Sequence, residues 1–402
     1  MTWSDVLFES LYSSASRNGV YKAKEFHGRG TRIVNMGELF GYSFISNQEM
    51  KRVELDEREL DLNSLEDGDL LFGRRSLVES GAGKCSLVVN PLEPMTFESS
   101  IIRVRVNKEV VNPHFLYYYF LSPQGRGRIR SIVSGTNVKG IRSSDLKKIS
   151  VANPLKVVQD GIVAALSAYD DLVDNNSRRM ALLEDSARQL YREWFVRLRF
   201  PGHEHTPIVD GVPQGWERKT LGDLCREVRD MVLPEALEPD TPYIGLEHIP
   251  RRSISLNDWG TVEEVTSSKC RFKTGEIIFG KIRPYFHKVG VAFVDGVTSS
   301  DAIVVRPVDE TLHGLVLMTM SSDEFVAVTS QQMKEGSKMP RADWKQMKAF
   351  SLPVPPPGLL KSFDDLIQPT VEQLRSLSFA NQKLRQARDL LLPRLMNGEL
   401  AV

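Results

Sequence analysis

An apolar seam with heptad spacing runs from Ile162 to Trp194, and it limits what this chain can fold into. Alternate steps of four and three residues from Ile162 reach, in order, Leu166, Tyr169, Val173, Asn176, Met180, Leu183, Ala187, Leu190 and Trp194. A 3.5-residue repeat keeps one narrow stripe of a helix against a partner helix, as in a coiled coil. Charged residues off the seam, such as Arg178 and Glu184, are expected to face water. The pattern therefore predicts a long helix that packs on a second one.

A second seam of ten positions begins at Phe363. The same steps reach Ile367, Thr370, Leu374, Leu377, Asn381, Leu384, Arg388, Leu391 and Leu395. If the two helices pack antiparallel, Asn176 in fifth place meets Asn381 in sixth place, and this polar pair would fix the register. Arg388 is expected to face Val173 and either to extend past it into solvent or to find an acid such as Asp174. The alternative is two unrelated amphipathic surface helices whose asparagines face solvent, because a 3.6-residue period imitates 3.5 over short spans.

Length and composition favour several soluble domains. A chain of 402 residues with 41% apolar residues suggests two or three domains with real cores. Basic and acidic residues balance at 52 each, so nucleic-acid binding would have to come from local basic patches. The three cysteines fit neither a disulfide framework nor a zinc site. The N-terminal segment lacks the features of a signal peptide, and no apolar run reaches the length of a membrane span. We therefore expect a cytoplasmic protein.

Sequence landmarks recur in order, which predicts an internal duplication. The stretch 68–74 (Gly-Asp-Leu-Leu-Phe-Gly-Arg) is echoed by 275–281 (Gly-Glu-Ile-Ile-Phe-Gly-Lys), and similar echoes link 99–100 with 299–300 and 135–136 with 336–337. A seam helix follows each copy, and a repeat near 200 residues indicates duplicated domains rather than a solenoid. Strands are expected at 86–89 and 101–106, and a helix at 115–121. The predicted fold is a pseudo-twofold tandem of mixed α/β (α+β) domains, separated by two long helices in an antiparallel coiled coil. The expected globular domains are residues 1–153 and 201–353, and the expected long helices are residues 154–200 and 354–402.

Basic clusters in both predicted domains are candidate DNA contacts. Lys and Arg neutralise phosphates, whereas Arg and Asn can also recognise base edges in the major groove. A solvated surface is the alternative for any single cluster, but equivalent clusters near equivalent Gly-Thr and Gly-Ser turns favour DNA. Among the aromatic residues of the second cluster, Tyr285 is the one expected to be exposed. The candidate residues are Arg74, Arg126, Arg128, Arg130, Asn137, Lys139 and Arg142 in the first domain, and Lys281, Arg283, Tyr285, Lys334, Lys338 and Arg341 in the second.

Motifs for catalysis, cofactors or metals are weak. No amino-methyltransferase motif occurs, and residues 81–85 (Gly-Ala-Gly-Lys-Cys) have Val78 and Cys85 where a phosphate-binding loop needs glycine and a hydroxyl. We interpret them as a tight turn. His203 and His205 lie in a predicted linker without a third ligand, so a solvated linker is favoured over a metal site. We expect no catalytic site, metal or cofactor. The open alternatives are a stand-alone nuclease or methyltransferase with an unrecognised site, and a coiled-coil scaffold that binds proteins.

Several stretches resemble one known family along nearly the whole chain. They are 189–196 (Gln-Leu-Tyr-Arg-Glu-Trp-Phe-Val), 212–217 (Val-Pro-Gln-Gly-Trp-Glu), 243–249 (Tyr-Ile-Gly-Leu-Glu-His-Ile) and 388–395 (Arg-Asp-Leu-Leu-Leu-Pro-Arg-Leu). With the order domain, helix, domain, helix, they resemble the specificity subunit of type I restriction-modification enzymes. The first domain departs from the family by lacking a Gly-Trp-Glu opening.

The resemblance implies a non-catalytic subunit that binds double-stranded DNA. Each recognition domain would recognise half of a split, asymmetric target, and the helices would set the spacer between the halves. Methyltransferase and motor-nuclease subunits would dock around the helices. For the methyltransferase we expect an exposed apolar surface near Trp194, Phe195 and Leu392.

Overall fold

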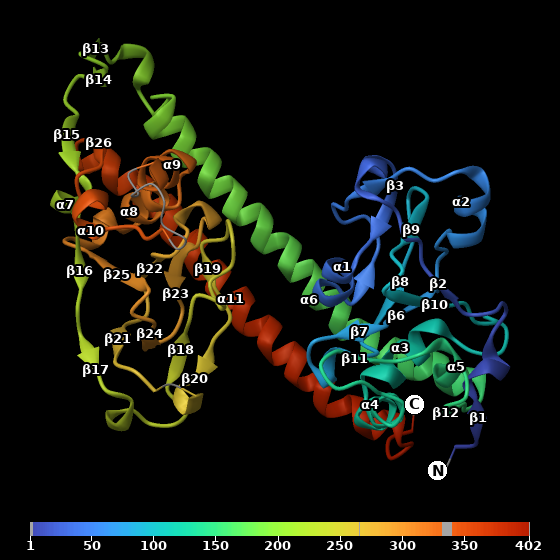
Figure 1. Ribbon diagram of the computed structural model, residues 1–402. Helices are drawn as coiled ribbons and strands as arrows, with labels where there is room; N and C mark the ends of the chain where they lie inside the picture. Colours follow the sequence, from blue (N-terminus) through green and yellow to red (C-terminus); the bar gives the residue numbers. More distant parts are fainter. Residues whose placement is uncertain (1–2, 265, 332–339, 402) are drawn as a thin grey trace. The chain divides into compact units, whose positions relative to one another are not determined.

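The computed structural model describes residues 3–264, 266–331 and 340–401, and the chain divides into two compact units (Figure 1). Unit 1 contains Met1–Asp171 and Leu384–Val402, and unit 2 contains Leu172–Lys383. Each unit thus combines a globular domain with part of both long helices, α6 (Lys156–Tyr191) and α11 (Pro357–Met396). No helix in the described part of the chain is both long and apolar enough to cross a membrane.

Unit 1 is built on a five-stranded mixed sheet with a buried, apolar centre. Its spatial order is β2 (Arg17–Asn18), β10 (Ile101–Val104), β6 (Leu70–Gly73), β8 (Cys85–Val88) and β4 (Phe44–Ile45). β4 runs parallel to β8, and the other neighbours are antiparallel. β8 and β10 confirm the strands expected near residues 86–89 and 101–106. Smaller sheets are formed by β5 (Arg52–Val53), β3 (His27–Val34) and β9 (Met95–Phe97), by β1 (Asp5–Leu7) and β12 (Ser150–Ala152), and by β7 (Arg75–Ser76) and β11 (Lys139–Gly140).

Helices cover this sheet. The helix expected at 115–121 is α3 (Pro113–Leu121), which begins after Asn112, whose side chain accepts a hydrogen bond from the amide of His114 at 2.9 Å. α4 (Pro123–Arg130) follows at once, and the aromatic residues of α3 fill the core over β8. The other helices of unit 1 are α1 (Met36–Gly41), α2 (Glu57–Asn63) and α5 (Ser143–Leu146).

Unit 2 repeats the five-stranded sheet, as the sequence echoes predict. Its spatial order is β16 (Cys225–Val228), β25 (Ala302–Pro307), β22 (Ile277–Gly280), β23 (Val289–Ala292) and β19 (Ser255–Leu256). β19 runs parallel to β23, just as β4 does to β8. A second five-stranded sheet contains, in spatial order, β17 (Met231–Val232), β21 (Lys269–Phe272), β24 (Gly296–Thr298), β18 (Pro242–Ile244) and β20 (Gly260–Thr261). Two further sheets have two strands each. One pairs β15 (Glu217–Thr220) with β26 (Ser351–Val354), and the other pairs β13 (Ile208–Val209) with β14 (Val212–Pro213).

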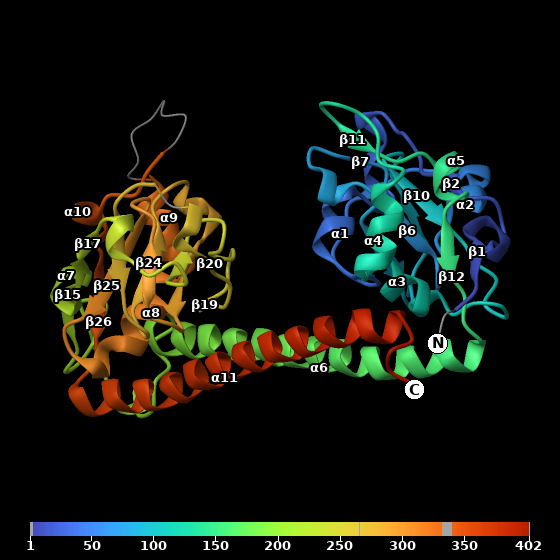
Figure 2. The same ribbon diagram turned by 90° about the horizontal axis from the view of Figure 1, so that it is seen from below.

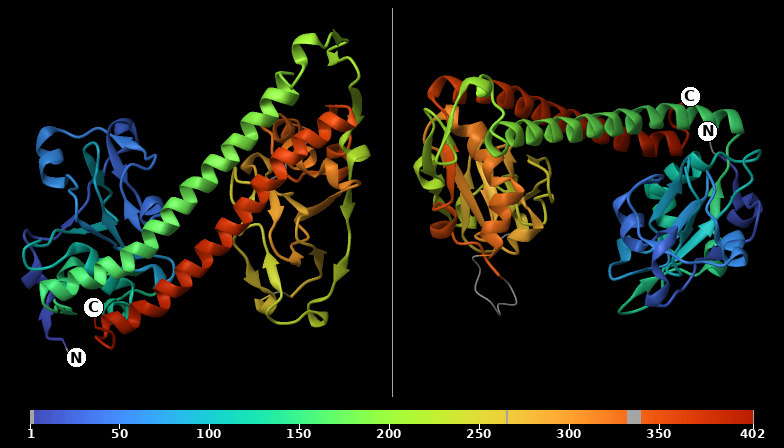
Figure 3. Two further views of the ribbon diagram at one scale, coloured as in Figure 1. Left: turned by 180° about the vertical axis from the view of Figure 1, so that it is seen from behind. Right: turned by 90° about the horizontal axis from the view of Figure 1, so that it is seen from above.

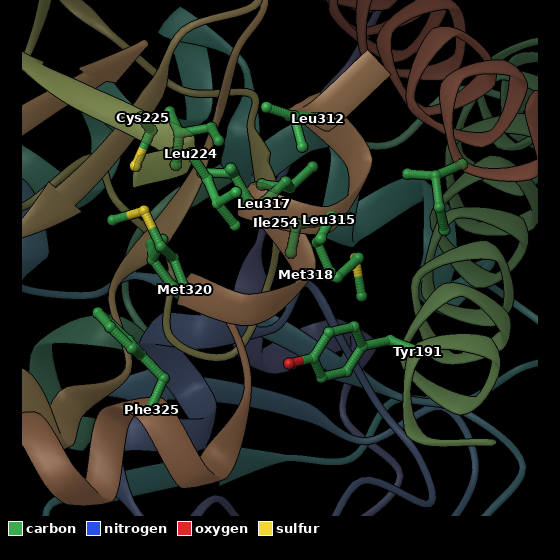
Figure 4. Close-up of a cluster of buried hydrophobic side chains, with 14 of the residues drawn as sticks. Tyr191, Leu224, Cys225, Ile254, Leu312, Leu315, Leu317, Met318, Met320 and Phe325 are labelled. Atoms are coloured by element: carbon green, nitrogen blue, oxygen red, sulfur yellow. The ribbon is translucent and has the colours of Figure 1, made fainter. Parts of the chain in front are cut away.

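The helix pair α8 (His313–Met320) and α9 (Asp323–Gln331) takes the place that α3 and α4 have in unit 1. A serine lies between the two helices of each pair. Ser122 and Ser322 each accept a hydrogen bond from the amide three residues later, at 3.2 Å. Figure 4 shows Tyr191 of α6 directed toward α8, where its hydroxyl donates to Thr319 at 3.2 Å. The remaining helices of unit 2 are α7 (Leu221–Leu224) and α10 (Trp344–Met347).

Within unit 2, α6 and α11 run antiparallel side by side (Figure 3). Asn176 Nδ2 donates to Asn381 Oδ1 at 3.0 Å, and farther along the rings of Trp194 and Phe363 lie 5.6 Å apart. The predicted meeting of the two asparagines is therefore confirmed. The predicted exposure of Glu184 is wrong, because its carboxylate is only 5% exposed and accepts hydrogen bonds from Ser253 and Ser255 at 2.7 Å.

Within unit 1, the same seam contains a buried charge. Arg388, in eighth place, pairs with Asp170, the residue after Tyr169 in third place. The expected partner Asp174 instead pairs with Arg178 at 2.7 Å. Asp170 also accepts from the hydroxyl of Tyr118 at 2.7 Å. Burial and the neighbouring Asp170 raise the pKa of Tyr118, so the hydroxyl stays a donor.

The prediction of an exposed apolar surface near the helix ends is wrong for the three residues that it named. Trp194, Phe195 and Leu392 are all buried. Phe195 packs edge-on against Phe363, with ring centroids 4.8 Å apart, and also against Trp216. Leu392 belongs to the core of unit 1. These residues join helix to domain within each unit, whereas Val196 at 52% and Leu390 at 73% near them are exposed.

Candidate nucleic-acid interface

A cation follows the central strand of the main sheet in unit 1. Arg74 comes directly after β6, and its amide donates to the carbonyl of Ser100 at 2.8 Å. Its guanidinium donates to the carbonyl of Ser99 at 3.4 Å. The carbonyl of Arg74 accepts from the amide of Ile141 at 3.0 Å. These bonds fix a half-buried cation between the 99–100 turn and the segment that leads into α5.

The equivalent cation in unit 2 makes the same set of bonds. The Lys281 amide donates to Asp301 at 2.7 Å, its Nζ donates to the carbonyl of Ser300 at 3.0 Å, and its carbonyl accepts from Ala342 at 2.9 Å. Arg74 and Lys281 are 207 residues apart, as the sequence echo predicts, whereas the turn residues that bind them are offset by 201 residues, one more than the echo of 99–100 in 299–300. The duplication therefore extends from the sequence landmarks to individual hydrogen bonds.

Beyond each cation the chain pairs with a second segment. In unit 1, Arg75 pairs with Gly140 and Ser76 with Lys139, so that β7 and β11 lie side by side (Figure 2). In unit 2, Ile282 bridges to Arg341, and the amide of Arg283 donates to Pro340 at 2.9 Å. Both units thus present the loop before α5 or α10 beside the strand-end cation.

The unit 1 loop carries two of the predicted contacts. Ser134 and Gly140 exchange backbone hydrogen bonds of 2.9 Å, and residues 134–138 between them are exposed. Gly135 has a φ of 104°, and an added Cβ would lie 2.2 Å from the carbonyl oxygen of Val138, so only glycine fits this turn. The loop leaves Asn137 exposed and Lys139 half-buried.

The α4 arginines are largely engaged within unit 1. The Arg126 guanidinium donates to the carbonyls of Ser80, Ala82 and Gly83 at 2.7–3.3 Å, so it holds a turn together. Arg128 pairs with Asp5 at 2.6 Å. Arg130 lies 3.4 Å from Glu79 and is 75% exposed. Exposed ion pairs contribute little, which leaves the charge of Arg130 accessible to a phosphate.

Arg142 is exposed just before α5. In unit 2, Tyr285 is 51% exposed, as the sequence predicts, and Arg283 beside it is exposed as well. Arg341 lies 3.1 Å from Asp301 and faces solvent. The structure therefore brings Lys281, Arg283 and Arg341 together around one strand end. The predicted contacts Lys334 and Lys338 lie outside the described residues.

The stretch with a faint likeness to a phosphate-binding loop is a tight turn. Lys84 Nζ donates to the carbonyl of Phe40 at 2.6 Å, and Cys85 is buried in β8, where burial raises the pKa of its thiol. Cys225 and Cys270 are also free and buried. In residues 3–264, 266–331 and 340–401, no three His, Cys, Asp or Glu side chains gather in a way that could hold a metal ion.

Comparisons with known proteins agree on one kind of protein. A family model described as "Type I restriction modification DNA specificity domain" matches residues 17–185. The type I restriction enzyme MjaIX specificity subunit of Methanocaldococcus jannaschii is 23% identical over 397 residues, which cover 95% of this chain and 89% of that protein. The HindI specificity subunit of Haemophilus influenzae is 20% identical over 439 residues, with 92% and 94% covered.

A solved structure shares the fold. The S subunit of a type I restriction-modification system from M. genitalium superposes with a TM-score of 0.58 at 16% identity, covering 98% of this chain and 96% of that one. At this identity the likeness concerns the fold: two mixed α/β domains with two long helices.

Proposed function

The chain is a non-catalytic DNA specificity subunit of a type I restriction-modification system, and on that premise we propose that each globular domain recognises one half of an asymmetric, bipartite DNA target. The observation that carries the proposal is the repeated bond set at Arg74 and Lys281. The same backbone frame appears twice with different side chains around it, such as Ser76 in one unit and Arg283 in the other. Two diverged copies of one frame should bind different half-sites, whereas a symmetric dimer binds a palindrome.

The positions of the side chains suggest a division of labour. Exposed Arg130 and Arg142 suit phosphates, which supply affinity without sequence information. Asn137 in unit 1 and Arg283 in unit 2 lie on exposed segments beside the strand-end cations, and their side chains can form paired hydrogen bonds with adenine and guanine, respectively. Arg126 instead stabilises a turn of unit 1 through its hydrogen bonds to three carbonyls.

The long helices set the distance between half-sites and bind the methyltransferase and motor-nuclease subunits. α6 and α11, at 36 and 40 residues, correspond to roughly 54–60 Å of helix at about 1.5 Å per residue. Exposed leucines on these helices, Leu182 at 68% and Leu390 at 73%, offer apolar contacts for partners in place of the buried Trp194 and Phe195. Three free, buried cysteines suit the reducing cytoplasm, where the complex would act.

Mapping methylated bases in the genome of a host that carries this chain and its partner subunits tests the proposal. We expect one asymmetric motif in two parts with a spacer of fixed length. Lys281→Ala and Arg283→Ala should relax only one part, and Arg74→Ala and Asn137→Ala only the other. A palindromic motif, or variants that change both parts alike, would contradict it. The purified chain alone, incubated with DNA and S-adenosylmethionine, should methylate nothing; turnover would favour a stand-alone enzyme.

A further inference from the structure

Exposed apolar side chains occupy equivalent places in the two units. In unit 1, Leu77 is 83% exposed and Val78 is 59% exposed directly after β7. In unit 2, Tyr285 is 51% exposed. The register shows the equivalence: Arg75 faces Gly140 as Ile282 faces Arg341, so Val78 corresponds to Tyr285, and Leu77 corresponds to Pro284, which is buried.

The unit 2 turn holds Tyr285 rigidly. Arg283 and His287, on either side of the Pro284–Phe286 turn, both have left-handed backbones, with φ of 50° and 55°. Such backbone conformations are strained, and they persist only where the surrounding structure imposes them. The imposing bonds are present: the amide of Arg252 donates to the carbonyl of His287 at 2.9 Å, and the His287 ring bonds the carbonyl of Ser321 at 2.7 Å. The Arg251 guanidinium also lies 4.0 Å from the centre of the Phe286 ring.

The unit 1 turn is supported in a different way. The amide of Val78 donates to Ser76 Oγ at 3.1 Å, and the carbonyl of Val78 accepts from Gly81 at 3.1 Å. Arg126 binds three carbonyls of the residues that follow, from Ser80 to Gly83. In both turns, hydrogen bonds to the rest of the unit hold the backbone. The apolar side chains of Leu77 and Val78 in one turn and Tyr285 in the other, here called the apolar tips, are exposed.

A single exposed apolar residue has no special meaning, but exposure at matching positions of two diverged domains does. Each tip is next to an exposed arginine, Arg75 in unit 1 and Arg283 in unit 2. A protein partner would have to match an apolar tip and a cation at each of two different sites. Duplex DNA offers both features at every step, since phosphates flank a stack of apolar bases.

We propose, on the premise of the function proposed above, that the Leu77–Val78 pair and Tyr285 are wedges that insert between bases and partly unstack one base step in each half-site. Inserted apolar side chains kink DNA in this way, and the cost is lowest at pyrimidine–purine steps such as TA and CA. Each domain would thus recognise the deformability of one step in addition to hydrogen-bonding base edges. Each half-site should contain a flexible step that no hydrogen bond recognises.

The test uses the specificity subunit in complex with its methyltransferase subunits, bound to a duplex that contains the mapped target. 2-Aminopurine, which brightens when it unstacks, replaces each adenine in turn. We expect one position in each half-site to brighten several-fold on binding. Tyr285→Ala should abolish the signal in one half-site, and L77A/V78A should abolish it in the other. Tyr285→Phe should keep the signal, because a wedge needs the ring and not the hydroxyl.

Matched controls come from apolar residues of similar exposure elsewhere. Leu92→Ala at 83% exposure in unit 1 and Leu233→Ala at 62% in unit 2 should leave both signals unchanged. The proposal is overturned if no position brightens, if Tyr285→Phe fails like Tyr285→Ala, or if the controls behave like the wedge variants. It is also overturned if the wedge variants lose the methyltransferase subunits on size exclusion, since the tips would then contact protein. These outcomes leave the proposed function standing, which fails only if the wild-type complex does not distinguish the mapped target from other DNA.

Discussion

Asn176 Nδ2 donates a hydrogen bond of 3.0 Å to Asn381 Oδ1 across the two helices of unit 2. Asn381 is 5% exposed, and its own amide lies 3.4 Å from Ser177 Oγ. The pair is one polar layer in a mostly apolar seam. A shift by one heptad in either direction would separate the two amides and place one of them against a leucine, Leu374 or Leu183, where an unpaired amide costs about 1–3 kcal/mol. The pair therefore favours one register over its neighbours.

Replacing one asparagine should destabilise the chain, whereas replacing both should not. Asn176→Leu leaves the Asn381 carbonyl buried without its donor and should lower the free energy of unfolding by about 1–2 kcal/mol. The double variant N176L/N381L removes both polar groups and should melt above the single variants and at or above the wild type. Calorimetric melting temperatures of the four proteins measure this. A double variant less stable than either single one would show that the seam needs the amides for packing as well as for register.

Arg388 should be costly to remove because Asp170 is only 11% exposed. Burial opposes the charge of Arg388, but Asp170 and Asp389 together raise the pKa of its guanidinium. Arg388→Met leaves the Asp170 carboxylate without its cationic partner. The free energy of unfolding should fall by on the order of 2–3 kcal/mol, somewhat less than the ~3–5 kcal/mol for a fully buried pair. Adding Asp170→Asn should restore most of the loss, because an amide can still accept from Tyr118. Urea denaturation of both variants tests this, and equal stability of the two would contradict it.

His313 makes unit 2 sensitive to acid. Its Nε2 lies 2.7 Å from the carbonyl of Gly275 and its Nδ1 lies 2.9 Å from Gln368 Nε2, which suits a neutral ring that donates once and accepts once. Burial lowers the pKa of His313, although Gly275 and Asp364 oppose the shift. A depressed folded-state pKa gives stability that is present above the unfolded value, near 6.5, and lost as the pH falls below it.

The free energy of unfolding should therefore fall below about pH 6.5, by at most ~1.4 kcal/mol per pH unit for this ring. His313→Gln should flatten the loss, while His205→Gln on the exposed surface should not. Burial also lowers the pKa of His287, so some acid sensitivity should persist in the first variant. Denaturation at pH 7.5, 6.5 and 5.5 measures the slopes. Identical slopes for wild type and His313→Gln would exclude this histidine as a cause.

Arg126 and Arg142 should behave differently although both were predicted from one basic cluster. Arg126 bonds three carbonyls, so Arg126→Ala should lower stability by about 1.5–3 kcal/mol. Arg142 is exposed, so Arg142→Ala should leave stability unchanged but reduce the slope of log affinity against log salt by about 1. Melting curves and DNA binding by the complex at several salt concentrations separate the two roles. A salt slope that changes only with Arg126→Ala would reverse the assignment.

The sequence predicted those features that depend on periodicity. Helix seams and repeated landmarks follow from residue spacing, so the two helices, the duplicated sheet and the Asn176–Asn381 contact could be predicted. The predicted partner of Arg388 was wrong. In an antiparallel seam of ten positions, position eight is opposite position three, which is Tyr169, and the acid beside Tyr169 is Asp170 rather than Asp174.

Contacts between segments distant in sequence could not be predicted. Glu184 is buried by two serines about 70 residues away, and Arg126 binds a turn more than 40 residues earlier. Neither contact leaves a local pattern in the chain. The exposure of Leu77 and Val78 has the same origin, since it depends on how β7 pairs with β11. Charge clustering finds a basic region but not which of its members face solvent.

If the helices set the spacer of the DNA target, lengthening both should lengthen the spacer. One seven-residue repeat inserted at facing positions of α6 and α11 preserves the seam and adds about 10.5 Å, or roughly three base pairs at about 3.4 Å each. The methylation motif should keep both half-sites and gain about three base pairs between them. Insertion in α6 alone shifts Asn176 from Asn381 and should destabilise the chain without defining a new spacer. A spacer that stays unchanged after the double insertion, in a complex that still methylates DNA, would show that the helices do not set it.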